Sequence, residues 1–573
     1  MRQLNRLNQF QRLWQQSRGA PQHTSVAAMA ACCFCSERHL RTLLTQWQQA
    51  GWLQWRGEAG RGKRGTLLFL HSPDQLRQQL LRQQLDAGLS AQAMQLLQLA
   101  PDGLFNLVQP LMGGQWHKDA PVLRIPYYRP LETIAPLQIT GRAEQYLAHQ
   151  LFSGLTRFHH DQLEGDLAHH WQCDAQGTLW YFWLRPQLCW HNGEPLVADQ
   201  LAAQFAAILR HPVAHYLLAD VETVDAPHPL TLRIRLRQPD FWLAHRLAHL
   251  LCLLPHPLDA RLGSGAWKLA HFSADLVRIE SHARWHFQLP LMQAVEYWIT
   301  PQLFDSALGT SCRHPVQISI AQPDELTLLR PVGHSISLGF CYLVCHPHPG
   351  FSAAQARKLF ALIQRSGVVG QLPLDEGLIT PSQELLPGWP VPQIADEPVA
   401  LPATLTLHYH LPVELHEMAH ALQQLLQQQG CNLHVVFHPV KSWRDGELPD
   451  DADLVMGDRL IGDAPVFTLA SWLQMDPLWQ PLQQNSKIAG QLETIQRLPQ
   501  EADRAAAVQT LFQQLMQEGM LLPLFNYHYQ ISAPPGIEGI ALNSLGWFDF
   551  NRAWIPPPGW PADPVQEQRE TLP

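Results

Sequence analysis

The sequence lacks long apolar runs and has little of the charge that disordered chains carry. No run of about eighteen apolar residues occurs, so we expect no transmembrane helix. Charged residues form 16% of the 573 residues and apolar residues 46%, which excludes the composition of a disordered protein. The start, MRQLNRLNQFQRLW, has neither an apolar core nor a small-residue cleavage site. We therefore expect a multidomain protein of the cytoplasm with no membrane partner.

Cysteine is also sparse, and its spacing excludes the common zinc-binding patterns. The ten cysteines are scattered along the chain, and in the cytoplasm we expect them to be reduced. Cys32, Cys33 and Cys35 cluster, but no Cys or His pair follows at the spacing of a zinc finger. We expect ordinary thiols here, with no metal.

Histidine, in contrast, is abundant, and some of the thirty residues occur at metal-site spacings. The stretch His416-Glu417-Met418-Ala419-His420 matches the H-E-x-x-H motif of zinc proteases, but Gln423 and Leu426 stand where the extended motif needs Gly and His. No carboxylate or cysteine completes a ligand set by spacing for the other candidates. These are His159-His160, His169-His170 and His408 with His410. We expect no metal, no cofactor and no catalysis.

The net charge of −9 is unevenly distributed. Residues 1–72 contain ten basic and two acidic residues, so this segment carries +8 and the remainder −17. Such an asymmetry favours an anion-binding N-terminal part, with double-stranded DNA as the first candidate partner.

The same 72 residues show the order helix, helix, turn, helix and hairpin. Apolar residues fall near one face over 3–16, which predicts the first helix. Thr24 is suited to cap a second helix, which leads to a turn at 32–35. Ser36 is suited to cap a third helix that ends at Gly51. This order predicts a winged helix-turn-helix domain.

The third helix has the pattern of a recognition helix. Its buried stripe repeats at i, i+3, i+4 and i+7, through Leu40, Leu43, Leu44 and Trp47. Polar side chains off this stripe are predicted to face the major groove. They are Ser36, Glu37, Arg38, His39, Arg41, Thr42 and Thr45. Of these, we expect Arg38, Arg41 and Thr42 to discriminate between bases.

A basic hairpin follows this helix. Residues 52–56 and 66–70 read as strands, with the glycine-rich segment GEAGRGKRG between them. Glycines allow a close approach of the backbone to phosphates, and Arg61, Lys63 and Arg64 supply charge. We therefore predict a wing that contacts the DNA backbone.

The head resembles that of a known family. The segments CFCSERHLRTLL at 33–44, GWLQW at 51–55 and GRGKR at 60–64 are similar to the N-terminal domain of SgrR-type transcription regulators. The resemblance continues through IPYYRPL at 125–131 and ends at GWFDF at 546–550, so it covers nearly the whole chain. It implies a DNA-binding regulator.

The rest of the chain resembles the oligopeptide and nickel class of solute-binding proteins. LRP at 184–186, and WHNGEPL at 190–196 with Asp199, look like a signature of that class. GSGAW at 263–267 resembles its GTGPY turn with two departures, and 353–365 resembles one of its helices. The resemblance implies a two-lobed α/β fold of the periplasmic-binding-protein type (class II), which binds a ligand between its lobes and does not catalyse.

Local patterns favour the same α/β fold class. Residues 404–410 alternate as a strand does, 413–428 have helical spacing, and 431–437 return as a strand. This βαβ unit predicts two parallel strands covered by helices. We predict four parts in all: a winged helix-turn-helix (1–72), a helical connector (73–118) with a helix over 75–98, a ligand-sensing domain (119–556) and a disordered tail (557–573).

Candidate ligand contacts lie where strands end, since ligands bind there in α/β lobes. Tyr128 and Arg129 follow one predicted strand, and Asp458 and Arg459 follow another. The ligand is left open among a sugar phosphate, a peptide and another metabolite, and a monomer and a homodimer are equally compatible. We expect ligand binding to close the lobes and to bias the head. The alternatives are a transport component without regulatory role and an enzyme on the same lobes.

Overall fold

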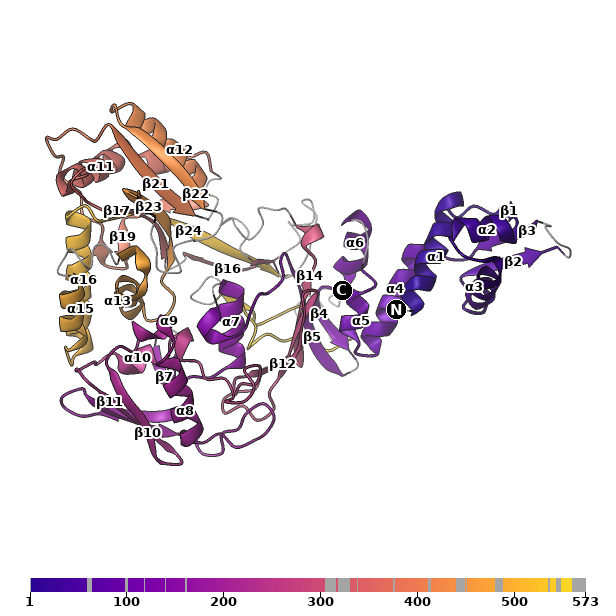
Figure 1. Ribbon diagram of the computed structural model, residues 1–573, viewed down its shortest axis with the longest axis horizontal. Helices are drawn as coiled ribbons and strands as arrows, with labels where there is room; N and C mark the ends of the chain where they lie inside the picture. Colours follow the sequence, from indigo (N-terminus) through magenta and orange to yellow (C-terminus); the bar gives the residue numbers. More distant parts are fainter. Residues whose placement is uncertain are drawn as a thin grey trace, which may run out of the picture.

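The computed structural model describes residues 2–558 except 59–63, 98–100, 118, 140, 160–161, 305–315, 318–329, 337–338, 375–376, 411–413, 439–448, 450, 480–487, 534–535 and 543–547. A small N-terminal head and a helical connector project from one end of a larger two-lobed body (Figure 1). The fold is mixed α/β, as predicted. Within the described residues, no helix combines the length and apolarity needed to cross a membrane.

The head is a winged helix-turn-helix. Its three strands form an antiparallel sheet in the order β1-β3-β2, beside three helices. The elements are α1 (Arg2–Ser17), β1 (Gln22–Thr24), α2 (Val26–Cys32), α3 (Glu37–Gln49), β2 (Leu53–Gly57) and β3 (Gly65–Phe69). The ring of Phe10 on α1 packs edge-on against Trp47, Trp52 and Phe69, at centroid distances of 5.8, 5.5 and 5.5 Å. One aromatic cluster therefore joins α1, α3 and the hairpin.

The prediction that Thr24 caps α2 is wrong. Thr24 ends β1 and pairs with Gly65 of β3, whereas Ser25 adopts the extended cap conformation and its hydroxyl oxygen accepts from the Ala28 N–H at 3.2 Å. Sheet pairing of Thr24 shifts the cap by one residue. At α3 both predictions hold: Ser36 caps the helix, and Gly51 follows it with φ 73°.

The two neighbouring hydroxyl residues allow a direct test of this cap. We expect Ser25→Ala to lower the free energy of unfolding by about 1 kcal/mol, because an N–H group of the first turn of α2 loses its acceptor. Thr24→Ala, which removes no cap hydroxyl, is the matched control and should cost less. Urea unfolding of the two variants checks the order, and a larger loss for Thr24→Ala would restore the original assignment.

The connector contains two helices where the sequence predicts one over 75–98. The first, α4 (Pro73–Asp86), ends where Gly88 adopts the left-handed conformation with φ 76°, and α5 (Ser90–Met94) follows in a new direction. Then come α6 (Pro101–Val108) and the 3-10 turn η1 (Gln109–Leu111). The buried Arg77 of α4 donates to the side chain of Gln11 on α1 at 2.5 Å and to the Leu96 carbonyl at 3.1 Å. Polar contacts thus fix the connector to the head.

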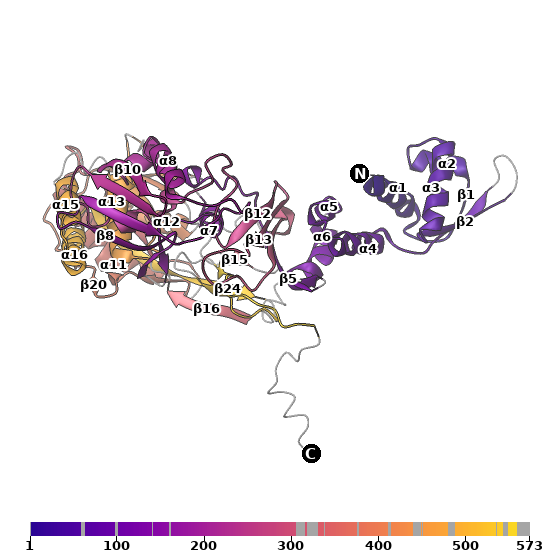
Figure 2. The ribbon, with the colours of Figure 1, turned by 90° about the horizontal axis from the view of Figure 1, so that it is seen from below.

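Lobe I of the body contains two sheets. The first has the order β12-β13-β14-β5-β4, and in it only β14 and β5 run parallel. Helix α7 (Arg142–Leu151) packs on its inner face, and the connector lies on the other face (Figure 2). The strands are β4 (Gly113–His117), β5 (Ala120–Tyr127), β12 (Trp267–Phe272), β13 (Leu276–Ser281) and β14 (Ala294–Ile299).

The second sheet of lobe I is antiparallel, with the order β10-β11-β9-β8, and α8 (Ala198–Ile208) packs against it. Its strands are β8 (Ala168–Cys173), β9 (Leu179–Leu184), β10 (Val221–His228) and β11 (Thr231–Leu236). The hairpin β6 (Thr156–His159) and β7 (Gln162–Gly165), with the short helices α9 (Pro212–His215) and α10 (Leu243–Arg246), completes this part.

Lobe II is built on one large sheet of order β15-β24-β17-β23-β21-β22, with β16 and β18 also pairing to β24. The predicted βαβ unit is confirmed, because β21 and β22 are parallel and α12 joins them. Helices α11 and α12 pack on one face, and α13, α15 and α16 on the other. The strands are β15 (Val316–Gln317), β16 (Arg330–Ile336), β17 (Gly339–Cys345), β18 (Ile379–Pro381), β21 (Thr404–His410), β22 (Asn432–His438), β23 (Leu454–Leu460) and β24 (Leu521–Ala533). The helices are α11 (Ala353–Ser366), α12 (Glu414–Gln427), α13 (Pro465–Met475), α15 (Ile488–Gln496) and α16 (Glu501–Gln517).

Strand β24 joins the two lobes. Leu522 near its start belongs to the core of lobe II, whereas Ala533 at its end packs in the core of lobe I. The chain after β24 returns to lobe I, where Phe550 packs edge-on against Tyr146 of α7 at 5.3 Å. This crossing is typical of a two-lobed binding fold, in which strands that pass between lobes form the hinge.

Candidate nucleic-acid and ligand sites

Helix α3 presents the predicted recognition residues on its exposed face. Its apolar stripe is buried in the head, and the Ser36 hydroxyl oxygen accepts from the His39 N–H at 3.2 Å, which fixes the start of the helix. The side chains predicted to face DNA are all exposed: Ser36, Glu37, Arg38, His39, Arg41, Thr42 and Thr45. The structure therefore brings these seven residues together on one polar surface.

The contacts within this surface are weak or local. Arg41 pairs with Glu37 at 3.4 Å, but both side chains are more than half exposed, so the pair contributes little to stability. The Thr42 and Thr45 hydroxyls donate to carbonyls one turn back, at 3.3 and 3.0 Å. Within the described part of the chain, no protein acceptor binds the Arg38 guanidinium, so a DNA base would not have to displace one.

The wing has the predicted strands and only part of its tip is described. The β2–β3 register runs from Leu53 opposite Phe69 to Gly57 opposite Gly65. Arg64 is exposed, whereas Arg61 and Lys63 lie outside the described residues. Arg56 at the end of β2 is also exposed. Arg56 adds a positive charge to the wing, and the sequence analysis did not assign it to the DNA-binding residues. Its position directly before the glycine-rich segment could have indicated this.

Sequence reasoning also missed an aromatic projection beside the recognition helix. Phe34, in the turn between α2 and α3, is 83% exposed and adopts a left-handed conformation with φ 51°. The guanidinium of Arg12 lies over its ring at 5.3 Å. Periodicity gives no signal for a bulky turn residue of this kind, because such residues rarely adopt positive φ.

The cysteine cluster of the head is built from protonated thiols. The Cys33 thiol is buried and donates to the Gln9 carbonyl at 3.6 Å, and burial raises its pKa to about 12. The Cys32 thiol donates to the Arg12 carbonyl at 3.5 Å. Metal ligation needs thiolates, which these surroundings disfavour.

The histidine motifs do not assemble ligand sets in the described structure. His416 of the H-E-x-x-H stretch bonds through Nδ1 to the Tyr409 hydroxyl at 2.6 Å. His408 and His410 share a face of β21, and His408 bonds to His438 at 2.8 Å. Across the residues that the structure describes, no three His, Cys, Asp or Glu side chains gather as they would around a metal ion.

Arg129, one of the two predicted ligand residues of lobe I, forms an internal ion pair. Arg129, just after β5, donates to both carboxylate oxygens of Glu144 on α7, at 2.6 and 2.8 Å. Its guanidinium also lies over the rings of Tyr127 and Tyr128, at 5.8 and 5.9 Å. Burial alone would lower the pKa of Arg129, but Glu144 raises it, so the charge is fixed. Glu144 therefore compensates the charge that was predicted for a ligand.

The predicted residues of lobe II lie at the end of β23. Asp458 and Arg459 are partly exposed, and the Arg459 guanidinium lies over the Trp472 ring of α13 at 5.7 Å. Arg459 also acts across the lobes, on His249 of lobe I. Burial, together with the smaller effects of the charges of His149, Arg459 and Arg246, lowers the pKa of His249 to about 4. His249 thus lies where the lobes meet.

His149 is the second histidine that the sequence did not indicate. Its side chain on α7 is exposed to water, yet the surrounding protein desolvates it and lowers its pKa to about 4. The structure thus adds His149 and His249 to the candidate ligand residues, as two neutral groups that neither strand position nor motif revealed.

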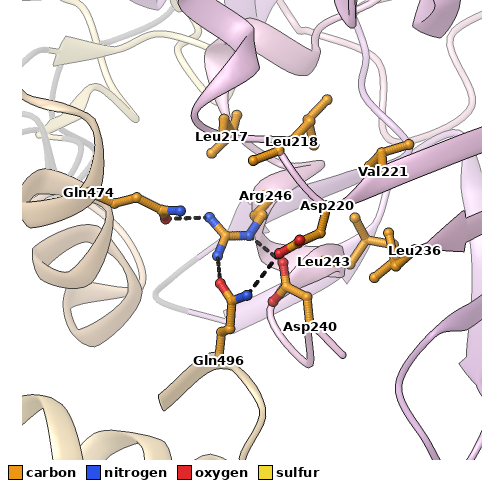
Figure 3. Close-up of a pocket in the computed structure, with 11 residues that line it drawn as sticks. Leu217, Leu218, Asp220, Val221, Leu236, Asp240, Leu243, Arg246, Gln474 and Gln496 are labelled. Carbon is orange, nitrogen blue, oxygen red and sulfur yellow. Dashed lines mark hydrogen bonds and ion pairs between the residues drawn. The ribbon is translucent and has the colours of Figure 1, made fainter. Parts of the chain in front are cut away.

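A buried polar network joins the two lobes (Figure 3). Arg246 of α10 donates to Asp240 at 2.5 Å and, across the lobes, to Gln474 at 2.8 Å and Gln496 at 3.0 Å. Gln496 in turn donates to Asp220 at 2.9 Å. The cavity among these residues measures about 10 Å³, which is room for about one water molecule. This is a contact between lobes, and it is too small for a metabolite.

Four histidines whose pKa is lowered predict a decrease in stability in acid. Desolvation lowers the pKa of His149, His245 and His249 to about 4 and that of His191 to about 3. In the unfolded chain the pKa of histidine is near 6.5. Between this pH and about 4, the unfolded chain therefore binds more protons than the folded chain does. We expect the free energy of unfolding to fall as the pH is lowered from about 6.5 to 4, as measured by urea unfolding.

A variant at His249 isolates one of these groups. The His249 Nδ1 accepts from the Leu251 N–H at 3.2 Å, and an asparagine oxygen can accept the same bond without titrating. His249→Asn should therefore flatten the pH dependence of stability, whereas His39→Asn, at an exposed head position, should leave it unchanged. Equal pH profiles for wild type and His249→Asn would contradict this account.

Head and body together define a class of protein: a winged helix-turn-helix fused to a two-lobed solute-binding fold. The family described as "Sugar transport-related sRNA regulator N-term" matches residues 5–119, and "Bacterial extracellular solute-binding proteins, family 5 Middle" matches residues 162–306. The chain is 51% identical to "Uncharacterized protein YbaE" of Escherichia coli (strain K12), over 97% of this chain and 100% of YbaE. It is 28% identical to the "HTH-type transcriptional regulator SgrR" of Pectobacterium atrosepticum, over 96% of this chain and 98% of SgrR. The chain belongs to the SgrR-type family that contains both proteins.

Solved structures similar to the body are solute-binding proteins. NikA from Brucella suis, solved with Fe(III)-EDTA, matches with a TM-score of 0.63 and 15% identity, covering 76% of this chain and 100% of NikA. A dipeptide-binding protein from Pseudoalteromonas sp. SM9913, solved with Met-Leu, matches with a TM-score of 0.59 and 14% identity, covering 76% of this chain and 99% of that protein. At such identities the likeness establishes the fold alone, and it confirms the predicted periplasmic-binding-protein type.

Proposed function

We propose that this protein is a cytoplasmic transcription regulator that binds DNA through its head and responds to a small molecule bound between the lobes of its body. The observation that carries the proposal is the exposed polar face of α3 beside a basic hairpin, on a chain whose larger part has a binding fold. Relatives that match over nearly the full length support it, since they are named HTH-type transcriptional regulators.

The division of labour follows the predicted parts. The head (1–72) contacts DNA, the connector (73–118) joins it to the body, and the sensing domain (119–556) receives the ligand. Arg38, Arg41 and Thr42 discriminate bases. The wing residues Arg61, Lys63 and Arg64 contact phosphates.

The ligand site takes residues from both lobes. The proposed contacts are Tyr128, Arg129, Asp458 and Arg459, to which His149 and His249 are added. The charge of Arg459 in lobe II lowers the pKa of His249 in lobe I. A molecule bound between the two lobes would therefore change the surroundings of both residues. The ligand class stays open among sugar phosphates, peptides and other metabolites. The relatives are regulators and solute-binding proteins rather than enzymes, which favours binding without turnover.

A gel shift tests the proposal against a transport component that shares the binding fold. Purified full-length protein is mixed with duplex DNA from upstream of its own coding region, at low and at moderate salt. Retarded DNA that resists competition by random duplex supports the regulator. A transport component would retain no duplex at any salt concentration, and an enzyme would consume the small molecule that purifies with it.

The wing carries a prediction of its own. Arg61→Ala removes one phosphate contact, so the slope of log K against log salt should become shallower by about 0.9. Arg210→Ala is the matched control, because it removes the same charge from an exposed position of the body. Fluorescence anisotropy on a labelled duplex at several salt concentrations measures both slopes. An unchanged slope for Arg61→Ala would remove the wing from the DNA interface.

A further inference from the structure

The outer face of the first lobe I sheet carries a buried carboxylate. Glu296 on β14 is completely buried, and its Oε2 accepts from Arg124 Nε at 3.0 Å and from Trp298 Nε1 at 2.9 Å. Arg278 of β13 also donates to it. These three donors belong to the sheet itself, so they explain how the charge is tolerated in the interior.

The fourth donor comes from the connector. Ser90, the first residue of α5 and only 4% exposed, donates through its hydroxyl to Glu296 Oε1 at 2.6 Å. Burial alone would raise the pKa of Glu296, but the charge of Arg124 and the bonds from Ser90 and Trp298 lower it, so the carboxylate is ionised. A short hydrogen bond to an ionised acceptor is among the stronger and more directional contacts of a protein.

Apolar contacts surround this hydrogen bond. Leu276 of β13 and Trp298 of β14 belong to the same core as the connector and the head. Such contacts hold the connector against the sheet but are non-directional. The hydrogen bond from Ser90, in contrast, has one geometry, so it can select one orientation of α5 on the sheet.

The same strands lead to the proposed ligand site. Along β5, Leu123, Ile125 and Tyr127 face the core of lobe I, whereas Arg124 between them faces the connector. Five residues beyond Arg124, about 17 Å along an extended chain, Arg129 pairs with Glu144. On β14, which runs parallel to β5, Tyr297 packs on Tyr127 at 6.1 Å. A shift of β5 and β14 would therefore move Arg129 of the proposed ligand site directly.

We propose that Glu296 is a positioning residue, which sets the orientation of the DNA-binding head on lobe I through its hydrogen bond from Ser90. Head, connector and lobe I then move as one unit. A motion caused by ligand binding is transmitted to the head through β5 and β14, and the connector does not act as a flexible linker. The link to DNA rests on the proposed function, whereas the orienting contact itself does not.

The test uses full-length protein with Ser90→Ala, which removes the connector donor and leaves the sheet donors of Glu296 in place. We expect amide hydrogen exchange in α5 to rise by roughly tenfold, since a bond to a charged group is lost. The distance distribution from small-angle X-ray scattering should broaden, because the head samples more orientations. Exchange in β9, in the other sheet, should not change.

Two further variants separate orientation from general stability. Ser471→Ala removes a buried hydroxyl from α13 of lobe II and should leave scattering and α5 exchange at their wild-type values. Ser90→Thr restores a hydroxyl and should narrow the distance distribution again. Wild-type scattering and exchange in Ser90→Ala would overturn the proposal, as would equal broadening in Ser471→Ala.

A DNA measurement separates this proposal from the proposed function. Binding of a random duplex at low salt should be equal in wild type and Ser90→Ala, because the surface of α3 and the wing is intact. If wild type binds no duplex, the proposed function fails, while scattering and exchange still decide whether Glu296 orients the head.

Discussion

Replacing Arg38 by alanine is expected to weaken binding to the specific operator by about 5- to 150-fold, which corresponds to the 1–3 kcal/mol of one side chain that reads a base edge. The first-turn position of Arg38 on α3 and its exposed side chain support this size of effect. Binding to random duplex should fall much less, because only the contribution of one positive charge is lost there. The ratio of the two affinities, measured at one salt concentration, is the informative quantity.

A charge-matched variant completes the experiment. Arg82 on α4 is exposed and lies in the connector, so Arg82→Ala removes the same charge without touching the recognition helix. It should leave the ratio of specific to random affinity unchanged. If Arg38→Ala weakens specific and random DNA equally, Arg38 contacts only the backbone and base discrimination must come from elsewhere on α3.

The parts of the fold that were predicted well are those with local causes. Helix α3 begins after Ser36 and ends before Gly51 because a cap, a stripe and a left-handed glycine lie within one segment. The misplaced cap of α2 and the break at Gly88 have a different origin. Thr24 pairs with Gly65, forty-one positions away in the sequence, and Ser90 at the start of α5 bonds to Glu296, which is also remote in sequence.

The contrast between local causes and causes remote in sequence is stronger at the candidate ligand site. Arg129 lies just after β5 and Arg459 near the end of β23, but nothing near Arg129 in sequence indicates that Glu144 neutralises it. His149 and His249 become candidates only because the fold brings α7, the segment after α10 and the end of β23 together. Interlobe groups depend on contacts between distant segments, which composition and periodicity do not encode.

Breaking the Arg246 network is expected to cost roughly 3–5 kcal/mol of unfolding free energy, the largest effect predicted for a single substitution in this protein. Arg246→Ala leaves the buried carboxylate of Asp240 without its cation, and Gln474 and Gln496 lose the guanidinium that holds them to lobe I. Urea unfolding measures the loss. Arg233→Ala, at an ion pair whose side chains are 35% and 49% exposed, is the control and should cost far less than Arg246→Ala.

A double variant shows whether the loss in stability comes from an unpaired buried charge or from lost hydrogen bonds between the lobes. In the double variant Asp240→Asn/Arg246→Met both charges are absent, so most of the loss in stability should be recovered even though the bonds to Gln474 and Gln496 remain broken. If stability returns while scattering shows a more open body, the network closes the lobes and its charge is incidental to folding. A double variant as unstable as Arg246→Ala would instead mean that the glutamine bonds across the lobes carry the energy, and that closure and stability cannot be separated at this contact.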